Sequence, residues 1–130
     1  MVIDTSAIMA IIYGETEELI FMELISDTEE CLLSSPSYVE ASIVLGTKHG
    51  QQGIENLNLL IAALSITIVP FTVEQAQLAS EAFLKFGKGR HPAKLNMGDC
   101  FSYALAKSTN QPLLFKGNDF IYTDVAQVSY

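Results

Sequence analysis

Four acidic residues that lie far apart in the chain stand where apolar segments begin or end. Asp4 closes the apolar opening of the chain, Glu40 lies inside a helix-like run, Asp99 opens a second such run, and Asp119 follows a strand-like segment. Carboxylates from separate elements can meet only in the folded chain, where their repulsion favours a bound cation. Because few His or Cys residues lie near them, these oxygen ligands favour Mg²⁺ or Mn²⁺ over Zn²⁺.

Each of these acidic residues also has an ordinary structural explanation. Asp4 suits a helix N-cap, Asp99 suits the N3 position of a helix, and Asp119 and Asp124 both lie in turn-like sequence. Glu40 shares a helix face with the apolar residues three and four positions later, and the helix of Asp99 is apolar on nearly every side. Both observations favour partly buried carboxylates with a partner, but no single position decides between capping and metal binding.

The elements that must position these residues alternate between short strand-like and longer helix-like segments. This pattern predicts an α/β domain with a mostly parallel sheet. We expect strands at residues 1–4, 31–34, 66–69, 113–115 and, more weakly patterned, 125–128. We expect helices at residues 5–13, 15–26, 36–50, 53–64, 72–86 and 97–110. Ligands bind such sheets at the carboxyl ends of the strands, where Asp4 and the residues after 115 fall.

Length and composition fit one globular domain, residues 1–130, with a hydrophobic content of 49%. The longest apolar stretches are broken well before the ~18 residues that a membrane span needs. Asp4 and Glu15 interrupt the N-terminal segment, which therefore does not resemble a signal peptide. Cys31 and Cys100 both lie in apolar segments, as buried free thiols do in a reducing compartment. We therefore expect a cytoplasmic protein without a membrane segment.

The charge of the chain is unevenly distributed. A formal net charge of −8 argues against nucleic-acid binding when it is taken alone. Four of the seven Lys and Arg residues nevertheless lie in the Gly- and Pro-broken segment 85–94, which we call the basic loop. It contains Lys85, Lys88, Arg90, His91 and Lys94. The basic loop is a candidate for binding phosphate groups, and the alternative is a solvated loop whose charges cap the preceding helix.

The order and local sequence of the four acids resemble the PIN-domain ribonucleases, and most closely the VapC-type toxins of bacterial toxin–antitoxin pairs. The resemblance covers the whole chain, and its first and third motifs are the most specific. The matching segments are Asp-Thr-Ser-Ala at 4–7, Tyr-Val-Glu-Ala at 38–41, Gly-Asp-Cys-Phe-Ser-Tyr-Ala-Leu-Ala at 98–106 and Leu-Phe-Lys-Gly-Asn-Asp-Phe at 114–120. Gly87 to His91 also looks like a segment of those toxins. The chain departs from the pattern at Asn118, where relatives often carry an acid, so Asp119 and Asp124 both stay open as the fourth acid.

This resemblance implies a three-layer α/β/α fold and an endoribonuclease that depends on Mg²⁺ or Mn²⁺ and acts as the toxin of a pair. Asp4 and Asp99 would bind the metal directly. Glu40 would bind it through water or deprotonate the attacking water, and Asp119 would complete the site or hold a second metal. These residues would be the catalytic and metal-binding set.

The resemblance also implies partners. Thr5 or Ser6 would orient a carboxylate or contact phosphate, and the basic loop would bind the RNA backbone. A VapB-like antitoxin would reach the acidic pocket with its C-terminal segment, and a homodimer is expected. The amphipathic segments 15–25 and 54–64 offer surfaces for either partner.

Other classes fit the sequence less well or differently. A phosphoacceptor receiver domain is expected to show paired acids near its N-terminus, but Val2-Ile3 precedes Asp4. A phosphatase that forms an aspartyl phosphate needs a second Asp two residues after the first, where Ser6 stands. A catalytically degenerate PIN-like module that binds RNA or protein stays open as the alternative, although all four acids are present.

Overall fold

Four short parallel strands form the central sheet, in the spatial order β3-β2-β1-β4. The computed structural model describes every residue from 1 to 130. The strands are β1 (Val2–Ile3), β2 (Leu32–Ser34), β3 (Thr67–Val69) and β4 (Leu113–Leu114). The helices are α1 (Thr5–Ile12), α2 (Glu18–Ser26), α3 (Ser35–Ala63), α4 (Val73–Phe86) and α5 (Met97–Thr109).

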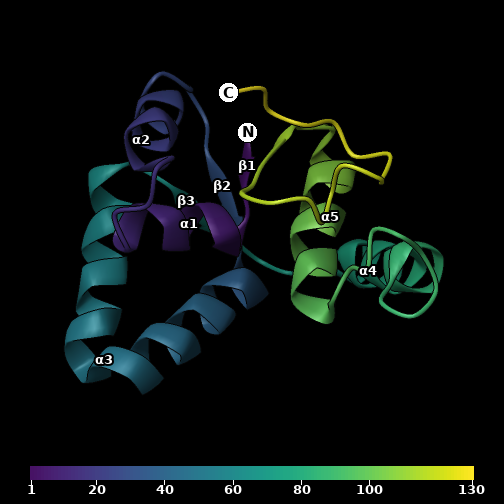
Figure 1. Cartoon of the computed structure of the whole chain (residues 1–130), viewed down its shortest axis with the longest axis horizontal. Coiled ribbons are helices and arrows are strands. Elements are labelled where there is room, and N and C mark those ends of the chain that lie inside the picture. Colours follow the sequence, from purple (N-terminus) through teal and green to yellow (C-terminus); the bar gives the residue numbers. More distant parts are fainter.

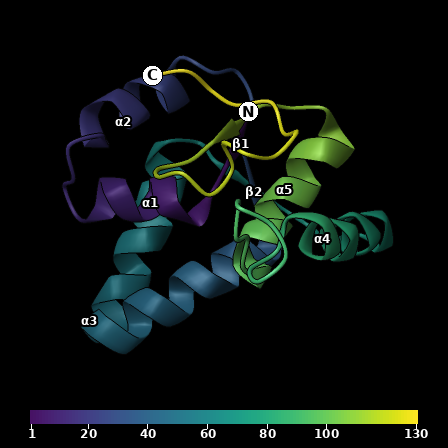
Figure 2. The same ribbon diagram turned by 45° about the vertical axis from the view of Figure 1, so that its right-hand side comes forward.

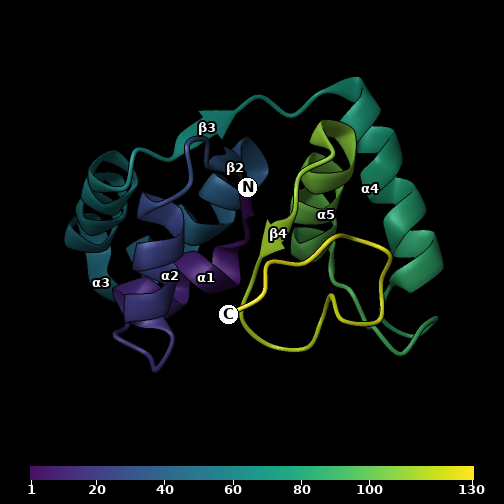
Figure 3. The same cartoon turned by 90° about the horizontal axis from the view of Figure 1, so that it is seen from above.

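Helices cover both faces of this sheet, with α1, α2 and α3 on one side and α4 and α5 on the other (Figures 1 and 3). Successive strand residues point to opposite faces, so Ile3 and Leu33 pack into the core beneath α1 to α3. Val2 and Leu113 pack into the second core, beneath α4 and α5. The three-layer α/β/α fold predicted from the sequence is therefore confirmed.

The structure differs from the predicted elements in three places. The two helices expected on either side of residue 50 are present, but they follow one another directly within α3 and meet at a kink at Gly50. Its φ of 64° and ψ of −153° suit glycine alone, so the kink depends on that residue. Helix α2 begins at Glu18 because the chain first turns at Gly14. The segment 125–128 makes a single bridge, between Leu113 and Gln127, and is not a strand.

The C-terminal segment returns across the molecule toward α2, as Figure 2 shows. The ring of Tyr130 packs edge-on against that of Phe21 in α2, with centroids 4.7 Å apart. Both cysteines, Cys31 and Cys100, are buried free thiols, as expected. No helix is both long and apolar enough to cross a bilayer. The carboxyl ends of β1 and β4 lie beside the N-termini of α1 and α5. The predicted acids lie in this region of the molecule.

Candidate functional site

Asp4 follows the carboxyl end of β1 and is the N-cap of α1. Its Oδ2 atom accepts hydrogen bonds from the backbone N–H of Ser6 at 2.9 Å and from the hydroxyl of Ser6 at 2.6 Å. The residue is only 4% exposed. Capping therefore occupies one carboxylate oxygen, and Ser6 orients the group so that Oδ1 takes no part in the cap.

Asp99 occupies position N3 of α5 in a complete capping box. The Asn96 N–H donates to Asp99 Oδ2 at 2.9 Å, and the Asp99 N–H donates to Asn96 Oδ1 at 2.8 Å. Burial raises the pKa of Asp99 to about 7, and the negative charges of Asp4, Asp119 and Glu40 contribute to the rise. Asp99 is thus both a helix cap and the most strongly perturbed carboxyl group of the site.

Glu40 reaches the same region from the second turn of α3. Partial burial raises its pKa, the charge of Asp4 raises it further, and an interaction with the Thr5 side chain partly offsets both effects. Its Oε2 atom lies against the backbone of Gly98, where an added Cβ would be only 1.9 Å from that oxygen. Gly98 is therefore required for the approach of Glu40 to α5.

No role was predicted for Gly98 from the sequence, although a glycine in the first turn of a helix is unusual. Glycine in the first turn of a helix disfavours the helix, so its occurrence between Met97 and Asp99 indicates that another group comes close to the backbone. Here the other group is a carboxylate from a distant helix. Only the tertiary structure identifies it as Glu40.

Asp119 and Asp124 lie in different surroundings. Partial desolvation and the charge of Asp4 raise the pKa of Asp119. Asp124 instead accepts a hydrogen bond from the Tyr103 hydroxyl at 2.6 Å and pairs with Lys107 at 3.1 Å, which together lower its pKa. Asp119 therefore lies within reach of the charge of Asp4, whereas Asp124 is bound to two side chains of α5.

The charge of Asp4 raises the pKa of the other three acids, but the four side chains do not share an ion-binding geometry. None of them forms a salt bridge, because the ion pairs of the chain involve other acids. No three His, Cys, Asp or Glu side chains are gathered closely enough to hold a metal ion. The donor set, four carboxylates with two hydroxyls beside them, fits Mg²⁺ or Mn²⁺. Binding such an ion at about 2.1 Å requires the side chains to rotate toward one another.

The basic loop is the connection from α4 to α5. Lys88, Arg90 and Lys94 are exposed and form no salt bridge. Lys85 belongs to the last turn of α4, with its ammonium group 4.9 Å from the centre of the Phe86 ring. His91 is half-buried against the same ring, and its Nδ1 accepts a hydrogen bond from the Ala93 N–H at 3.1 Å. Four cations, Lys85 among them, therefore face solvent, while Lys85 and His91 also contact the Phe86 ring.

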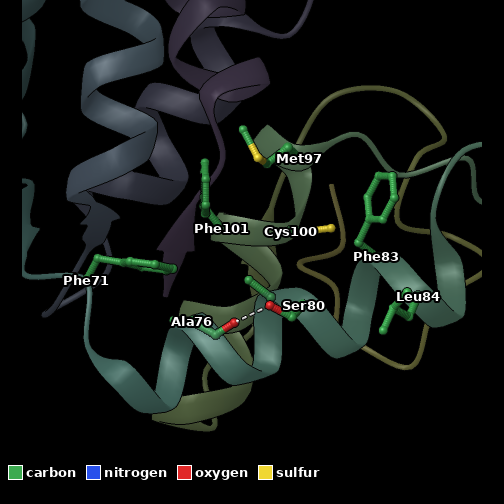
Figure 4. Close-up of a pocket in the computed structure, with 9 residues that line it drawn as sticks. Phe71, Ala76, Ser80, Phe83, Leu84, Met97, Cys100 and Phe101 are labelled. Carbon is green, nitrogen blue, oxygen red and sulfur yellow. Dashed lines mark hydrogen bonds between the residues drawn. The ribbon is translucent and has the colours of Figure 1, made fainter.

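Two apolar grooves adjoin the acids. The first, of about 510 Å³, lies between α4 and α5 and is lined by Phe71, Phe83 and Cys100 among others (Figure 4). The second, of about 580 Å³, runs along α3 and includes Glu40. Met97 and Phe101 line both grooves, so the two grooves meet at these side chains near the N-terminus of α5. An apolar surface thus leads directly to the acidic site.

Comparison with known proteins identifies the family to which this fold and this set of acids belong. A sequence profile of the PIN domain matches residues 1–126. The chain belongs to the PIN-domain family. Within this family it groups with the VapC proteins, since Ribonuclease VapC of Mycolicibacterium smegmatis is 45% identical over 128 residues. That alignment covers 98% of this PIN domain chain and 99% of the relative.

Solved structures share the fold of this PIN domain at low sequence identity. VapC20 of Mycobacterium tuberculosis, a toxin that cleaves the sarcin–ricin loop, has a TM-score of 0.76 and 14% identity, covering 98% of this chain and 97% of its own. A chain of a toxin–antitoxin complex from Klebsiella pneumoniae has a TM-score of 0.72 and 15% identity, covering 98% and 95%. The predicted family and fold are both confirmed.

Proposed function

We propose that this PIN domain is an endoribonuclease that requires Mg²⁺ or Mn²⁺ and acts as the toxin of a toxin–antitoxin pair. One observation carries the proposal: the charge of Asp4 helps to raise the pKa of Glu40, Asp99 and Asp119, which come from three other segments, and no Lys or Arg forms a salt bridge with any of the four. Such uncompensated charge is unfavourable unless a cation binds. The similarity to proteins named ribonuclease VapC gives the substrate class.

The residues then take distinct roles. Asp4 and Asp99 hold the cation directly, Asp119 completes the site, and Ser6 keeps Asp4 in its orientation. When bound, the metal lowers the pKa of its water and offsets charge on the phosphodiester. Glu40, partly buried and with a raised pKa, accepts the proton of the attacking water. Thr5 supports Glu40 through their side-chain interaction.

The exposed cations of the basic loop bind the RNA backbone in this proposal. Lys88, Arg90 and Lys94 have no acidic partner within the chain, so they are available to phosphate groups. The loop runs directly into Asn96, the N-cap of the helix that carries Asp99. Phosphates bound by the loop would therefore lie beside the acids.

Partner surfaces can be assigned in the same way. A groove of about 390 Å³ lies between α1, α2 and α3 and includes Ile12, Met22 and Leu59. It uses the amphipathic segments expected from the sequence and suits an apolar helix of a VapB-like antitoxin. The groove pair around Met97 and Phe101 is apolar and adjoins the acids, so it suits the C-terminal segment of the antitoxin, which is expected to reach the acidic pocket.

The decisive test of the proposed activity is RNA cleavage with defined cations. The parent should cleave RNA in Mg²⁺ or Mn²⁺ and stop when EDTA removes them, and Asp99→Asn should abolish cleavage without unfolding the chain. Asp27→Asn, a change at an exposed residue that follows α2, is the matched control and should stay active. Metal-independent cleavage, or full activity of Asp99→Asn, would contradict the proposal. RNA binding without any cleavage would favour the degenerate module instead.

A further inference from the structure

The segment that carries Asp119 is joined to Asp4 by two hydrogen bonds through Ser6. The backbone N–H of Lys116 donates to Ser6 Oγ at 3.0 Å, and Ser6 Oγ donates to Asp4 Oδ2 at 2.6 Å. Lys116 therefore lies two hydrogen bonds from one predicted metal ligand and three residues from another.

The side chain of Lys116 also forms ion pairs with the turn between α1 and α2. Its ammonium group lies 2.9 Å from Glu17 Oε2 and also pairs with Glu15. The two glutamates raise the pKa of Lys116, and Lys116 lowers the pKa of Glu17. This ion-pair cluster joins two irregular segments that no sheet or helix holds together.

The chain between Lys116 and Asp119 has little other support. Gly117 has a φ of 101° with open space around it, and the residues from 117 to 119 are all exposed. Beyond Asp119, Phe120 is 1% exposed and packs on Phe115 with ring centroids 4.9 Å apart. Asp119 therefore lies between two residues that contact the rest of the protein, Lys116 before it and Phe120 after it. The negative charge of Asp4 repels the Asp119 carboxylate.

From this geometry we infer that Lys116 is a positioning residue, which holds the Asp119 carboxylate beside Asp4 by fastening its segment to Glu15 and Glu17. The inference rests on the proposed metal-dependent function. A partly exposed ion pair adds little to global stability. Its effect is therefore on where Asp119 lies and not on whether the chain folds.

The chain supplies a matched control in a second ion pair of the same C-terminal segment. Lys107 pairs with Asp124 at 3.1 Å, and the side chains of Lys107 and Lys116 are 36% and 35% exposed. Both pairs restrain the segment that follows β4, but the Lys107 pair restrains it against α5. Lys107→Gln removes the same charge as Lys116→Gln without releasing residues 116–119.

The experiment is a titration of Mn²⁺ into the parent, Lys116→Gln, Lys116→Arg and Lys107→Gln, by calorimetry and without RNA. Lys116→Gln should raise the Kd for Mn²⁺ by about tenfold or more, as losses of supporting residues around a metal do. The sign is informative, because loss of a positive charge alone would tighten cation binding. Lys116→Arg should recover most of the affinity, Lys107→Gln should bind like the parent, and thermal unfolding of all four should be similar.

Three results would overturn the assignment. Unchanged or tighter Mn²⁺ binding by Lys116→Gln would show that Lys116 does not position Asp119. An equal loss in Lys107→Gln would indicate general loosening of the C-terminal segment. A higher KM for RNA with unchanged Mn²⁺ affinity would make Lys116 a substrate contact instead. The proposed function fails separately if the parent itself binds no Mn²⁺.

Discussion

Asp119 and Asp124 show how neighbouring residues of one type acquire different roles. Asp119 is coupled to the charge of Asp4, whereas Asp124 is bound by Tyr103 and Lys107. Their local sequences are both turn-like, so the sequence left the choice between them open. The distinction depends on Asp4 and on two residues of α5, which meet Asp119 and Asp124 only in the folded chain.

This difference predicts opposite outcomes for two matched substitutions. Asp119→Asn should reduce metal-dependent RNA cleavage strongly, by about a hundredfold, with little loss of stability, because it removes a carboxylate from the metal site. Asp124→Asn should retain cleavage but lose about 1 kcal/mol of unfolding free energy, because its ion pair and hydrogen bond weaken. Cleavage rates and urea denaturation of both variants check this. Loss of cleavage in Asp124→Asn alone would reverse the assignment.

The raised pKa of Asp99 predicts how stability depends on pH. The folded chain retains the Asp99 proton up to about pH 7, whereas the unfolded chain releases it near the ordinary value of 3.8. The folded state thus binds more protons between these values, so the unfolding free energy attributable to Asp99 falls as pH rises toward 7 and then levels. Glu40 and Asp119 shift in the same direction.

Urea denaturation in EDTA from about pH 4.5 to 8 measures this dependence. Asp99→Asn cannot titrate at this position, so its stability should decline less across the same range. Mn²⁺ should restore parent stability chiefly at the upper end, where the carboxylates are charged. Parallel curves for the parent and Asp99→Asn would contradict the assigned pKa.

At the scale of the elements, short-range patterns predicted most of the helices and their caps. Asp4 caps α1 and Asp99 occupies position N3 of α5, as expected, and Thr72 likewise caps α4 by accepting from the Gln75 N–H at 3.1 Å. Such caps depend on residues only a few positions apart, which the sequence shows directly. The break between two helices at Gly50 was predicted as well, although the sequence did not show that the second helix follows at once without a loop. The closeness of Glu40 to Gly98 could not be predicted, since it joins two helices.

Gly98→Ala tests that helix contact. In most helices this change raises stability by about 1 kcal/mol. Here the new Cβ would lie 1.9 Å from Glu40 Oε2, at the end of a flexible side chain, so Glu40 should move away, the stability gain should be smaller and RNA cleavage should fall. Gly46→Ala in α3 is the control, because its Cβ would meet only the end of the Ile54 side chain, at 3.1 Å. Denaturation and cleavage rates measure both, and a stabilised, fully active Gly98→Ala would contradict the account.

Across the whole molecule, the charges separate into an acidic body and one basic loop. A chain of net charge −8 repels RNA in general, so binding should depend on the few exposed cations of that loop. Lys85 and His91 also make contacts that shape the loop, which leaves Lys88, Arg90 and Lys94 as the main phosphate contacts. The sequence predicted the basic loop, but it did not distinguish the residues that shape the loop from those that are available to phosphate groups.

Neutralising Lys88 and Arg90 together should therefore flatten the salt dependence of RNA binding. Each lost phosphate contact lowers the slope of log K against log salt by about 0.7 for a single strand. The measurement is a salt titration in the Asp99→Asn background, where RNA is not consumed. Lys48→Gln, which removes a cation that lies over the Tyr13 ring in another part of the surface, is the control and should leave the slope unchanged. An unchanged slope in the double variant would assign the loop to structure or to a protein partner.

The central claim is that Asp4, Glu40, Asp99 and Asp119 together form one divalent-cation site. Its most direct test is crystal diffraction from the protein grown with Mn²⁺, with an anomalous difference map recorded for the parent and for Asp99→Asn. We expect a peak in the parent that is ligated by Asp4 and Asp99, with Asp119 and Glu40 turned toward it, and no peak in Asp99→Asn. A parent map with no peak among these four residues, or with its only peak beside Asp124 or between Glu15 and Glu17, would contradict it.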